Sequence, residues 1–161
     1  MKSVLLLGSN MGDREQLLSQ TRELISKQMD IISLSKVYET EAWGPSAKEK
    51  FLNQALLVET SFFPEELLGR LKGIESELGR VRKQRWSDRN IDIDILYFGD
   101  RIINLPTLQI PHPHISNRRF ALVPLAELLP DFVNPLERKN HQQLLEECSD
   151  EKKVWEYTPK P

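Results

Sequence analysis

Two aspartates near the middle of the chain combine a residue type and a spacing that could do chemistry. Residues 91–95 alternate isoleucine with aspartate, so Asp92 and Asp94 should project from one face of a strand and the isoleucines from the other. Neighbouring carboxylates repel each other and favour a positive partner above them. Because magnesium takes one or two protein carboxylates and completes its shell with water and substrate phosphates, the pair predicts a site for a magnesium-bound polyphosphate.

A basic segment, residues 80–89, precedes the aspartates directly. Within ten residues it contains five cations and a tryptophan: Arg80, Arg82, Lys83, Arg85, Trp86 and Arg89. Arginine binds phosphate oxygens in a bidentate manner, and a tryptophan there could stack on a planar ring or close over a nucleotide. Two plainer interpretations stay open, in which the aspartates are the solvated face of an antiparallel strand and the basic segment is a solvated loop.

Residues 8–12, Gly-Ser-Asn-Met-Gly, follow an apolar run and precede a helical pattern, which is the arrangement of a phosphate-binding turn. Gly8 and Gly12 permit backbone geometry that other residues resist. The segment is not a Walker loop, because the Gly-x-x-x-x-Gly-Lys-[Ser/Thr] pattern is absent. A plain tight turn explains this segment equally well.

Further polar residues could contact a ligand. Asn53 stands within an apolar strand pattern, and a buried amide needs hydrogen-bond partners that a heterocycle could supply. His112 and His114 have no further histidine or cysteine nearby, which argues against zinc and favours a histidine that donates to phosphate, with Arg118 close behind. Glu75, just before the basic segment, could orient an arginine or simply be exposed.

The elements that would position these residues follow from hydrophobic periodicity and turn residues. We expect strands at 4–7, 31–38, 51–62 and 91–98, helices at 14–28 and 64–78, a hairpin from 102–103 and 108–110, short helices within 118–129 broken by Pro124, and one helix near 142–148. The order strand, helix, strand, strand, helix, strand predicts an α+β fold, a ferredoxin-like βαββαβ sandwich with an antiparallel sheet. Both main helices should cover one face and leave the other open for ligands.

Size and composition set broader limits. The 161 residues, 39% hydrophobic and 29% charged, predict one domain over residues 1–161. A net charge of −2 argues against bulk nucleic-acid binding, and a single cysteine, Cys148, excludes an intrachain disulfide and suits a reducing compartment. No apolar stretch approaches the roughly 18 residues of a membrane helix or forms a signal peptide. We therefore expect a cytoplasmic monomer without a nucleic-acid or membrane partner.

Taken together, the motifs resemble those of the 6-hydroxymethyl-7,8-dihydropterin pyrophosphokinase (HPPK) family of folate biosynthesis. The matching segments span residues 4 to about 130: Leu7-Gly8-Ser9-Asn10-x-Gly12-Asp13, Tyr38-x-Thr40, Gly44-Pro45, Phe51-Leu52-Asn53-Gln54-Ala55, Glu75-x-x-Leu78-Gly79-Arg80-x-Arg82, Arg85-Trp86-x-x-Arg89-x-Ile91-Asp92-Ile93-Asp94-Ile95-Leu96, Ile110-Pro111-His112-Pro113 and Arg118-x-Phe120-x-Leu122-x-Pro124-Leu125. The segment from Arg85 to Leu96 is the most specific.

The resemblance implies transfer of the β,γ-pyrophosphoryl group of ATP to the hydroxymethyl oxygen of the reduced pterin, with release of AMP. It implies two Mg²⁺ ions held by Asp92 and Asp94, which with Arg82 and Arg89 would form the catalytic set. ATP would be bound by Glu75, Arg82, Trp86, Arg89, Ile95, His112 and Arg118. The pterin would be bound by Asn53, by Phe120 and by the backbone near Thr40, Ala42 and Trp43.

The chain departs from the family pattern at three places. His114 stands where many members carry an arginine, so one phosphate contact is replaced or lost. Phe51 stands where some members have tyrosine, which removes a hydroxyl from the pterin neighbourhood. Glu41-Ala42-Trp43 differs from the proline-rich version of that loop, so the resemblance covers the pterin loop less closely than the other segments.

Two rival functions fit the sequence less well. A nucleotidyltransferase also combines Gly-Ser with Asp-x-Asp, but there the two motifs lie close in sequence, whereas Ser9 and Asp92 are far apart here. A non-catalytic RNA-binding module would need stacking aromatics and a basic sheet surface, whereas this chain has 7% aromatic residues and two aspartates on that face.

Overall fold

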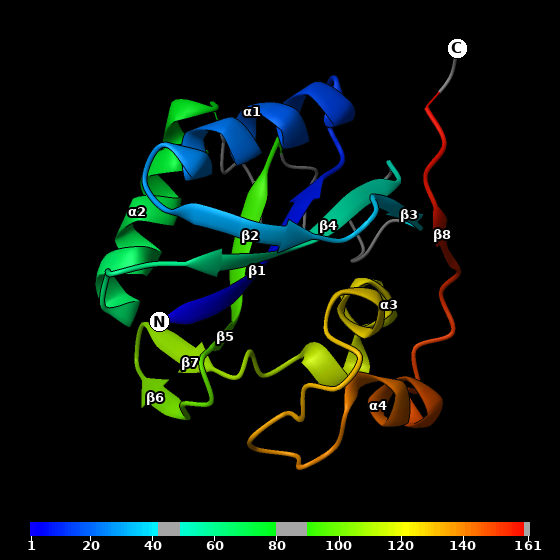
Figure 1. Ribbon diagram of the computed structural model, residues 1–161. Helices are drawn as coiled ribbons and strands as arrows, with labels where there is room; N and C mark the ends of the chain where they lie inside the picture. Colours follow the sequence, from blue (N-terminus) through cyan, green and yellow to red (C-terminus); the bar gives the residue numbers. More distant parts are fainter. Residues whose placement is uncertain (42–48, 80–89, 160–161) are drawn as a thin grey trace.

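The computed structural model describes residues 1–41, 49–79 and 90–159. Figure 1 shows one large sheet with helices packed against it and a small hairpin at its lower end. The large sheet contains β1 (Lys2–Ser9), β2 (Asp30–Leu34), β3 (Tyr38–Thr40), β4 (Phe51–Glu59), β5 (Asp92–Phe98) and β8 (Val154–Glu156). The hairpin is β6 (Ile103–Leu105) with β7 (Leu108–Ile110), and the helices are α1 (Arg14–Ser26), α2 (Pro64–Glu77), the 3₁₀ turn η1 (Ile115–Asn117), α3 (Arg119–Leu128) and α4 (His141–Glu147).

The sheet order β5-β1-β4-β3-β8, with β2 on the other end of β4, is antiparallel throughout. The ferredoxin-like α+β architecture is therefore confirmed. Leu5 and Leu7 of β1 point toward α1 and α2, where they join Leu18 and Leu71 in the larger core. This alternation along β1 means that its other residues, and those paired with them, face the opposite side.

The helix ends agree with the sequence. Asp13 caps α1, accepting a hydrogen bond from the backbone N–H of Gln16 at 3.1 Å. Pro64 begins α2. Gly79 follows the end of α2 with φ +78°, the left-handed conformation that favours glycine at this position.

The second face of the sheet is not fully open, so that expectation is wrong in part. Val4 and Leu6 of β1 form a second core with Leu122 and Leu125 of α3, and α4 contributes Leu144. Pro124 does not break α3, because its ring is buried within a continuous helix. Packing of the apolar α3 face outweighs the one backbone hydrogen bond that proline removes.

Two other expectations need correction. The strand expected at 31–38 is two strands, β2 and β3, which pair with different ends of β4. The polar tail contains β8, which pairs with β3 and was not expected. No helix in the described part of the chain is long and apolar enough to cross a membrane.

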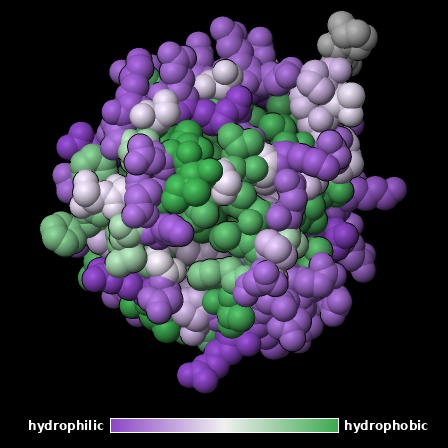
Figure 2. Space-filling view, viewed as in Figure 1, coloured by the Kyte–Doolittle hydropathy of each residue, from purple (hydrophilic) through white to green (hydrophobic). Residues whose placement is uncertain are grey.

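Apolar side chains gather at the centre of the molecular face shown in Figure 2, in the region where Figure 1 places β2 and β4. On β2, Ile32 and Leu34 are 47% and 49% exposed. A patch of a few apolar residues is ordinary for a globular surface, so it carries no functional assignment.

Candidate active site

The strand register places the two aspartates and Asn53 on one face. Asp92 pairs with Gly8, Gly8 pairs with Asn53, and Asp94 pairs with Leu6. Directly paired residues of antiparallel strands point to the same side, which here is the side of α3. Asp92 and Asn53 are thus two strands apart, about 10 Å between backbones, and Gly8 between them has no side chain.

Arg118 joins the aspartates from the segment that leads into α3. Burial lowers the pKa of its guanidinium, and the carboxylates of Asp94 and Asp92 oppose that effect, so the arginine stays charged beside both of them. Its guanidinium carbon lies 5.6 Å from the centre of the Phe120 ring. The structure therefore brings together a cation, two carboxylates and an aromatic ring from distant parts of the sequence.

His112 lies beside this group as a neutral donor. Its backbone N–H donates to Leu96 of β5 at 3.0 Å, and its Nδ1 accepts from the backbone N–H of His114 at 3.2 Å. Because Nδ1 is an acceptor, the proton of the neutral ring is on Nε2, which is a donor suited to a phosphate oxygen. Burial, then the charges of Arg118 and His114, lower the pKa of His112 to about 4.

This lowered pKa predicts a loss of stability in acid. The folded state holds His112 neutral while the unfolded chain binds a proton below about pH 6.5, so the free energy of unfolding should fall as the pH drops from 6.5 toward 4. We expect His112 to contribute about 1–2 kcal/mol of the decrease between pH 7 and pH 5. Urea denaturation of the protein and of His112→Gln at both pH values measures it. An identical decrease in the variant would contradict the assignment.

Two carboxylates on β5 fit a magnesium ion that is shared with a substrate. Asp92 and Asp94 are half-buried, and magnesium prefers such oxygen donors. Among the described residues, no group of three or more histidine, cysteine, aspartate or glutamate side chains gathers as a metal cage. An ion held by these two residues would take its remaining ligands from water and substrate phosphates.

The Asn53 side chain is 4% exposed, and a hydrogen bond holds the nitrogen end of its amide. Nδ2 donates to the carbonyl oxygen of Leu7 at 3.1 Å, while Oδ1 is buried and has no hydrogen-bond partner among the described residues. An unsatisfied buried acceptor is costly, which indicates that a donor is missing here. Asn53 was expected to be buried and to need a partner, and both expectations hold.

Glu75 and Ile95 lie on the other side of β5 from the aspartates. The carboxylate of Glu75, 5% exposed, accepts from the backbone N–H of Ile93 at 2.8 Å, and Ile95 belongs to the core under α1 and α2. The Glu75 carboxylate thereby satisfies a backbone N–H group of β5, which is an edge strand of the sheet. The structure gives Glu75 a part in holding β5, beside any contact with a nucleotide.

The turn at residues 8–10 connects the site to the rest of the fold. The Ser9 hydroxyl donates to the carbonyl of Asn90, and Nδ2 of Asn10 donates to the carbonyl of Glu49 at 3.4 Å. Both side chains are buried. These contacts favour a structural turn, which fixes the chain just before β5 and just before β4.

Thr40 is also used structurally. Its hydroxyl donates to the carbonyl of Lys153 at 2.9 Å, which holds the tail against β3. The contact expected from this residue was through the backbone, so its hydroxyl is not required for a ligand. The remaining expected site residues, Ala42, Trp43, Arg82, Trp86 and Arg89, lie outside the described residues.

Three supporting residues were not expected. Glu39 of β3 accepts from Arg14 at 2.7 Å and from the Trp155 indole at 3.0 Å, and Arg14 also donates to the carbonyl of Lys50 at 2.9 Å. Trp155 is separated from Glu39 by 116 positions, so no local pattern predicts the pair. A tryptophan in an otherwise polar tail was the one available indication.

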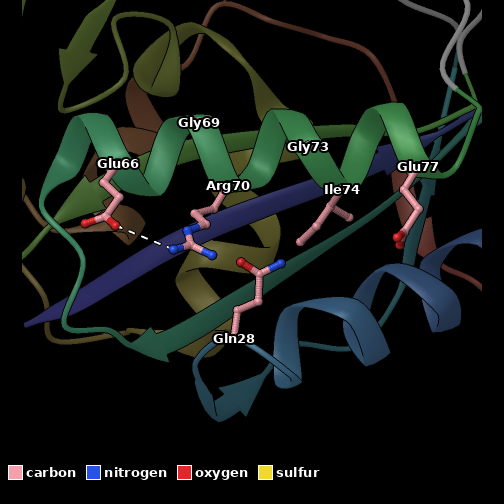
Figure 3. Close-up of a pocket in the computed structure, with 7 residues that line it drawn as sticks. All are labelled: Gln28, Glu66, Gly69, Arg70, Gly73, Ile74 and Glu77. Atoms are coloured by element: carbon pink, nitrogen blue, oxygen red, sulfur yellow. Dashed lines mark ion pairs between the residues drawn. The ribbon is translucent and has the colours of Figure 1, made fainter.

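A separate hollow of about 480 Å³ lies along α2, on the other side of the molecule's core from α3. Figure 3 shows that Glu66, Gly69, Arg70, Gly73 and Glu77 line it from the helix and that Gln28 closes it from the end of α1. Arg70 pairs with Glu66 at 3.6 Å within the helix. None of the expected site residues that the structure describes lines this hollow.

Comparisons with known proteins indicate the family of the chain. Residues 4–130 match the family model of 7,8-dihydro-6-hydroxymethylpterin-pyrophosphokinase (HPPK). The 2-amino-4-hydroxy-6-hydroxymethyldihydropteridine pyrophosphokinase of Aquifex aeolicus is 41% identical over 133 residues, 83% of each chain, and that of Bacillus subtilis is 43% identical over 124 residues, 76% of this chain and 74% of the relative.

Solved structures of Plasmodium falciparum HPPK-DHPS share the fold. A triple mutant with SDX-DHP has a TM-score of 0.70 at 18% identity, and a structure with pterin and p-hydrobenzoate has a TM-score of 0.71 at 18% identity. Each comparison covers 91% of this chain and 44% of the solved one, so the chain spans less than half of those longer proteins.

Proposed function

The chain belongs to the 7,8-dihydro-6-hydroxymethylpterin-pyrophosphokinase family, and we propose that the residues around Asp92, Gly8 and Asn53 carry out that family's reaction. The enzyme transfers the pyrophosphoryl group of ATP to 6-hydroxymethyl-7,8-dihydropterin, which gives the pterin pyrophosphate and AMP in tetrahydrofolate biosynthesis. Its site residues divide into a half that binds the nucleotide and a half that binds the pterin.

One observation carries the assignment. Asp92, Gly8 and Asn53 form a row across three strands on one sheet face, which supports a phosphate-and-metal position at Asp92 and a heterocycle position at Asn53 with one strand between them. A transfer reaction needs such a separation, because the acceptor oxygen must reach the β-phosphorus while each substrate keeps its own contacts.

The nucleotide lies at the Asp92 end of the row. Arg118 and the Nε2–H of His112 contact its phosphates. Glu75 supports this half by holding the backbone of β5 at Ile93, and Ile95, whose side chain is in the core, is left with its backbone for any contact with ATP. Arg82, Trp86 and Arg89 complete this half. Asp92 and Asp94 would hold two Mg²⁺ ions, which would neutralise the charge of the phosphates.

The pterin lies at the Asn53 end. Oδ1 of Asn53 accepts from an N–H group of the pyrimidine edge, and Phe120 stacks on the ring system, where its own ring is partly buried beside Arg118. The backbone near Thr40, Ala42 and Trp43 binds the remaining polar atoms of that edge.

The pterin alcohol itself is the nucleophile, so no covalent enzyme intermediate is required. Phosphoryl-type transfer depends chiefly on alignment and charge neutralisation. Arg118 stabilises the negative charge on the transferred group, and Arg82 acts on the same group during transfer. Because Arg82 acts mainly in the transition state, Arg82→Ala should reduce turnover more than ground-state ATP binding. Residues 1–161 are proposed to form one catalytic domain that acts as a monomer.

The experiment that tests the function measures AMP formation from ATP and Mg²⁺ with and without 6-hydroxymethyl-7,8-dihydropterin. We expect AMP and the pterin pyrophosphate in equal amounts, and only when the pterin is present. ADP as the product, AMP formation that needs no pterin, or no turnover at all would each contradict it. A nucleotidyltransferase would instead release pyrophosphate, and an RNA-binding module would release nothing.

Asn53→Ala tests the pterin half alone. Removing a hydrogen bond at a desolvated site costs roughly 1–3 kcal/mol, so pterin affinity should fall about 10- to 100-fold. The affinity for a non-hydrolysable ATP analogue should stay within about two-fold. Isothermal titration calorimetry with each ligand measures both, and Asn104→Ala on the exposed surface of β6 is the control. Equal loss of both affinities would show that Asn53 acts through the fold.

A further inference from the structure

Gly8 has no conformational reason to be glycine. The residues with positive φ in the described chain are Gly12, Gly79, Gly99 and Arg138, and Gly8 is not among them. It stands near the end of β1 in a regular antiparallel pairing with both neighbours, a backbone that any residue can adopt. The expectation that Gly8 supplies unusual backbone geometry is therefore wrong.

The structure indicates a steric reason for glycine at position 8. A Cβ atom at position 8 would lie 2.8 Å from Nδ2 of Asn53, closer than side-chain carbons approach other atoms. That nitrogen donates to the carbonyl oxygen of Leu7, the residue before Gly8, at 3.1 Å. Oδ1, the other end of the amide, has no hydrogen-bond partner within the part of the chain that the structure describes.

From these contacts we propose that Gly8 is a positioning residue for the pterin, and that it acts by letting the Asn53 amide lie over the β1 backbone with its oxygen toward the substrate. The proposal rests on the pyrophosphokinase function above. A side chain at position 8 would push Nδ2 away from the Leu7 carbonyl, and the amide would lose the bond that selects its orientation. Because an amide oxygen accepts and an amide nitrogen donates, the orientation decides which substrate edge is bound.

The consequence is substrate selectivity. With the 2-amino group of the pterin on Oδ1 of Asn53, the site favours the pterin over the analogue that carries oxygen in its place, because that analogue presents a second acceptor to Oδ1 at this position and keeps only its ring N–H groups as donors. Sites built around a hydrogen bond reject the analogue that leaves it unmade. Gly8 thus contributes to the choice of heterocycle without touching it.

The test is a double-mutant cycle of Gly8→Ala and Asn53→Ala, measured as kcat and KM for the pterin and for the 2-oxo analogue. We expect Gly8→Ala to raise the pterin KM about ten-fold, to reduce the preference for the pterin over the analogue by a similar factor and to change ATP affinity by less than two-fold. In the Asn53→Ala background the same substitution should change the pterin KM by less than two-fold, because the amide it disturbs is gone.

The controls separate folding from positioning. Gly69→Ala on α2 adds a Cβ that meets nothing within 4 Å, so it should leave both kinetic constants and the selectivity unchanged. Should Gly8→Ala alone fail to fold, the double variant is compared with Asn53→Ala, and equal pterin KM values support the proposal.

Normal KM and selectivity in Gly8→Ala, or an equal loss in both backgrounds, would overturn the proposal. The wild-type assay distinguishes this failure from failure of the function: without pterin-dependent AMP formation the proposed function itself is wrong.

Discussion

Replacing Asp92 or Asp94 with alanine is expected to abolish magnesium-dependent turnover while leaving the protein folded. Each carboxylate supplies a magnesium ligand beside the transferred group, and losing that charge stabilisation removes several kcal/mol, at least about 10³-fold in kcat. Both side chains are half-buried on the α3 face, outside the two apolar cores, so their removal leaves the packing intact. In each single variant the repulsion between the two carboxylates is relieved, and the remaining carboxylate still lies beside the charged Arg118.

Steady-state AMP formation across a range of Mg²⁺ concentrations measures the effect, with circular dichroism and thermal unfolding as checks on the fold. Asp92→Asn and Asp94→Asn keep shape and remove charge, and should be almost as impaired. Asp100→Ala, on the exposed turn after β5, is the matched control and should be fully active. Near-normal turnover in both alanine variants would refute the metal assignment.

Arg118→Ala is expected to reduce kcat/KM for ATP by about 100-fold, the effect of removing one preorganised cation from a developing anion. The guanidinium is partly buried beside Asp92, Asp94 and the Phe120 ring, so its position is set before substrates bind. Arg118→Lys should recover only part of the activity, since lysine has the charge without the planar fork.

Kinetics at saturating pterin separate this role from a structural one. Arg101→Ala, an exposed arginine beyond β5, should behave as the wild type. A loss in Arg118→Ala that is confined to the pterin KM would indicate that the residue acts through Phe120, and a loss of cooperative unfolding would indicate a role in the fold.

The central fold was predictable because its elements carry their own periodicity. The apolar run of β1, the helical spacing of Leu18 and Ile25 in α1 and the alternation in β5 each depend on a few consecutive residues. The three residues of β8 carry no such pattern, and they become a strand only because β3 provides an edge more than 110 positions away. The helix break expected at Pro124 was wrong for the same reason, because tertiary packing of α3 keeps the helix continuous there.

The site was predictable in its chemistry and less so in its geometry. Asp92, Asp94, Asn53 and Arg118 were recognisable by residue type and motif, but their common face depends on the β5-β1-β4 register. That register also places Gly8 so close to the Asn53 amide that a Cβ atom would not fit, a contact that no sequence pattern describes. The structural role of Glu75, whose buried carboxylate holds the backbone of β5, likewise depends on how α2 packs against that strand.

The most direct test of the account is a crystal structure with magnesium, a non-hydrolysable ATP analogue and 6-hydroxymethyl-7,8-dihydropterin bound together. We expect metal ions on Asp92 and Asp94, the pyrimidine edge of the pterin on Oδ1 of Asn53, and the hydroxymethyl oxygen between them, facing the β-phosphorus. A pterin bound away from Asn53, or phosphates and metal ions bound away from the two aspartates, would contradict it.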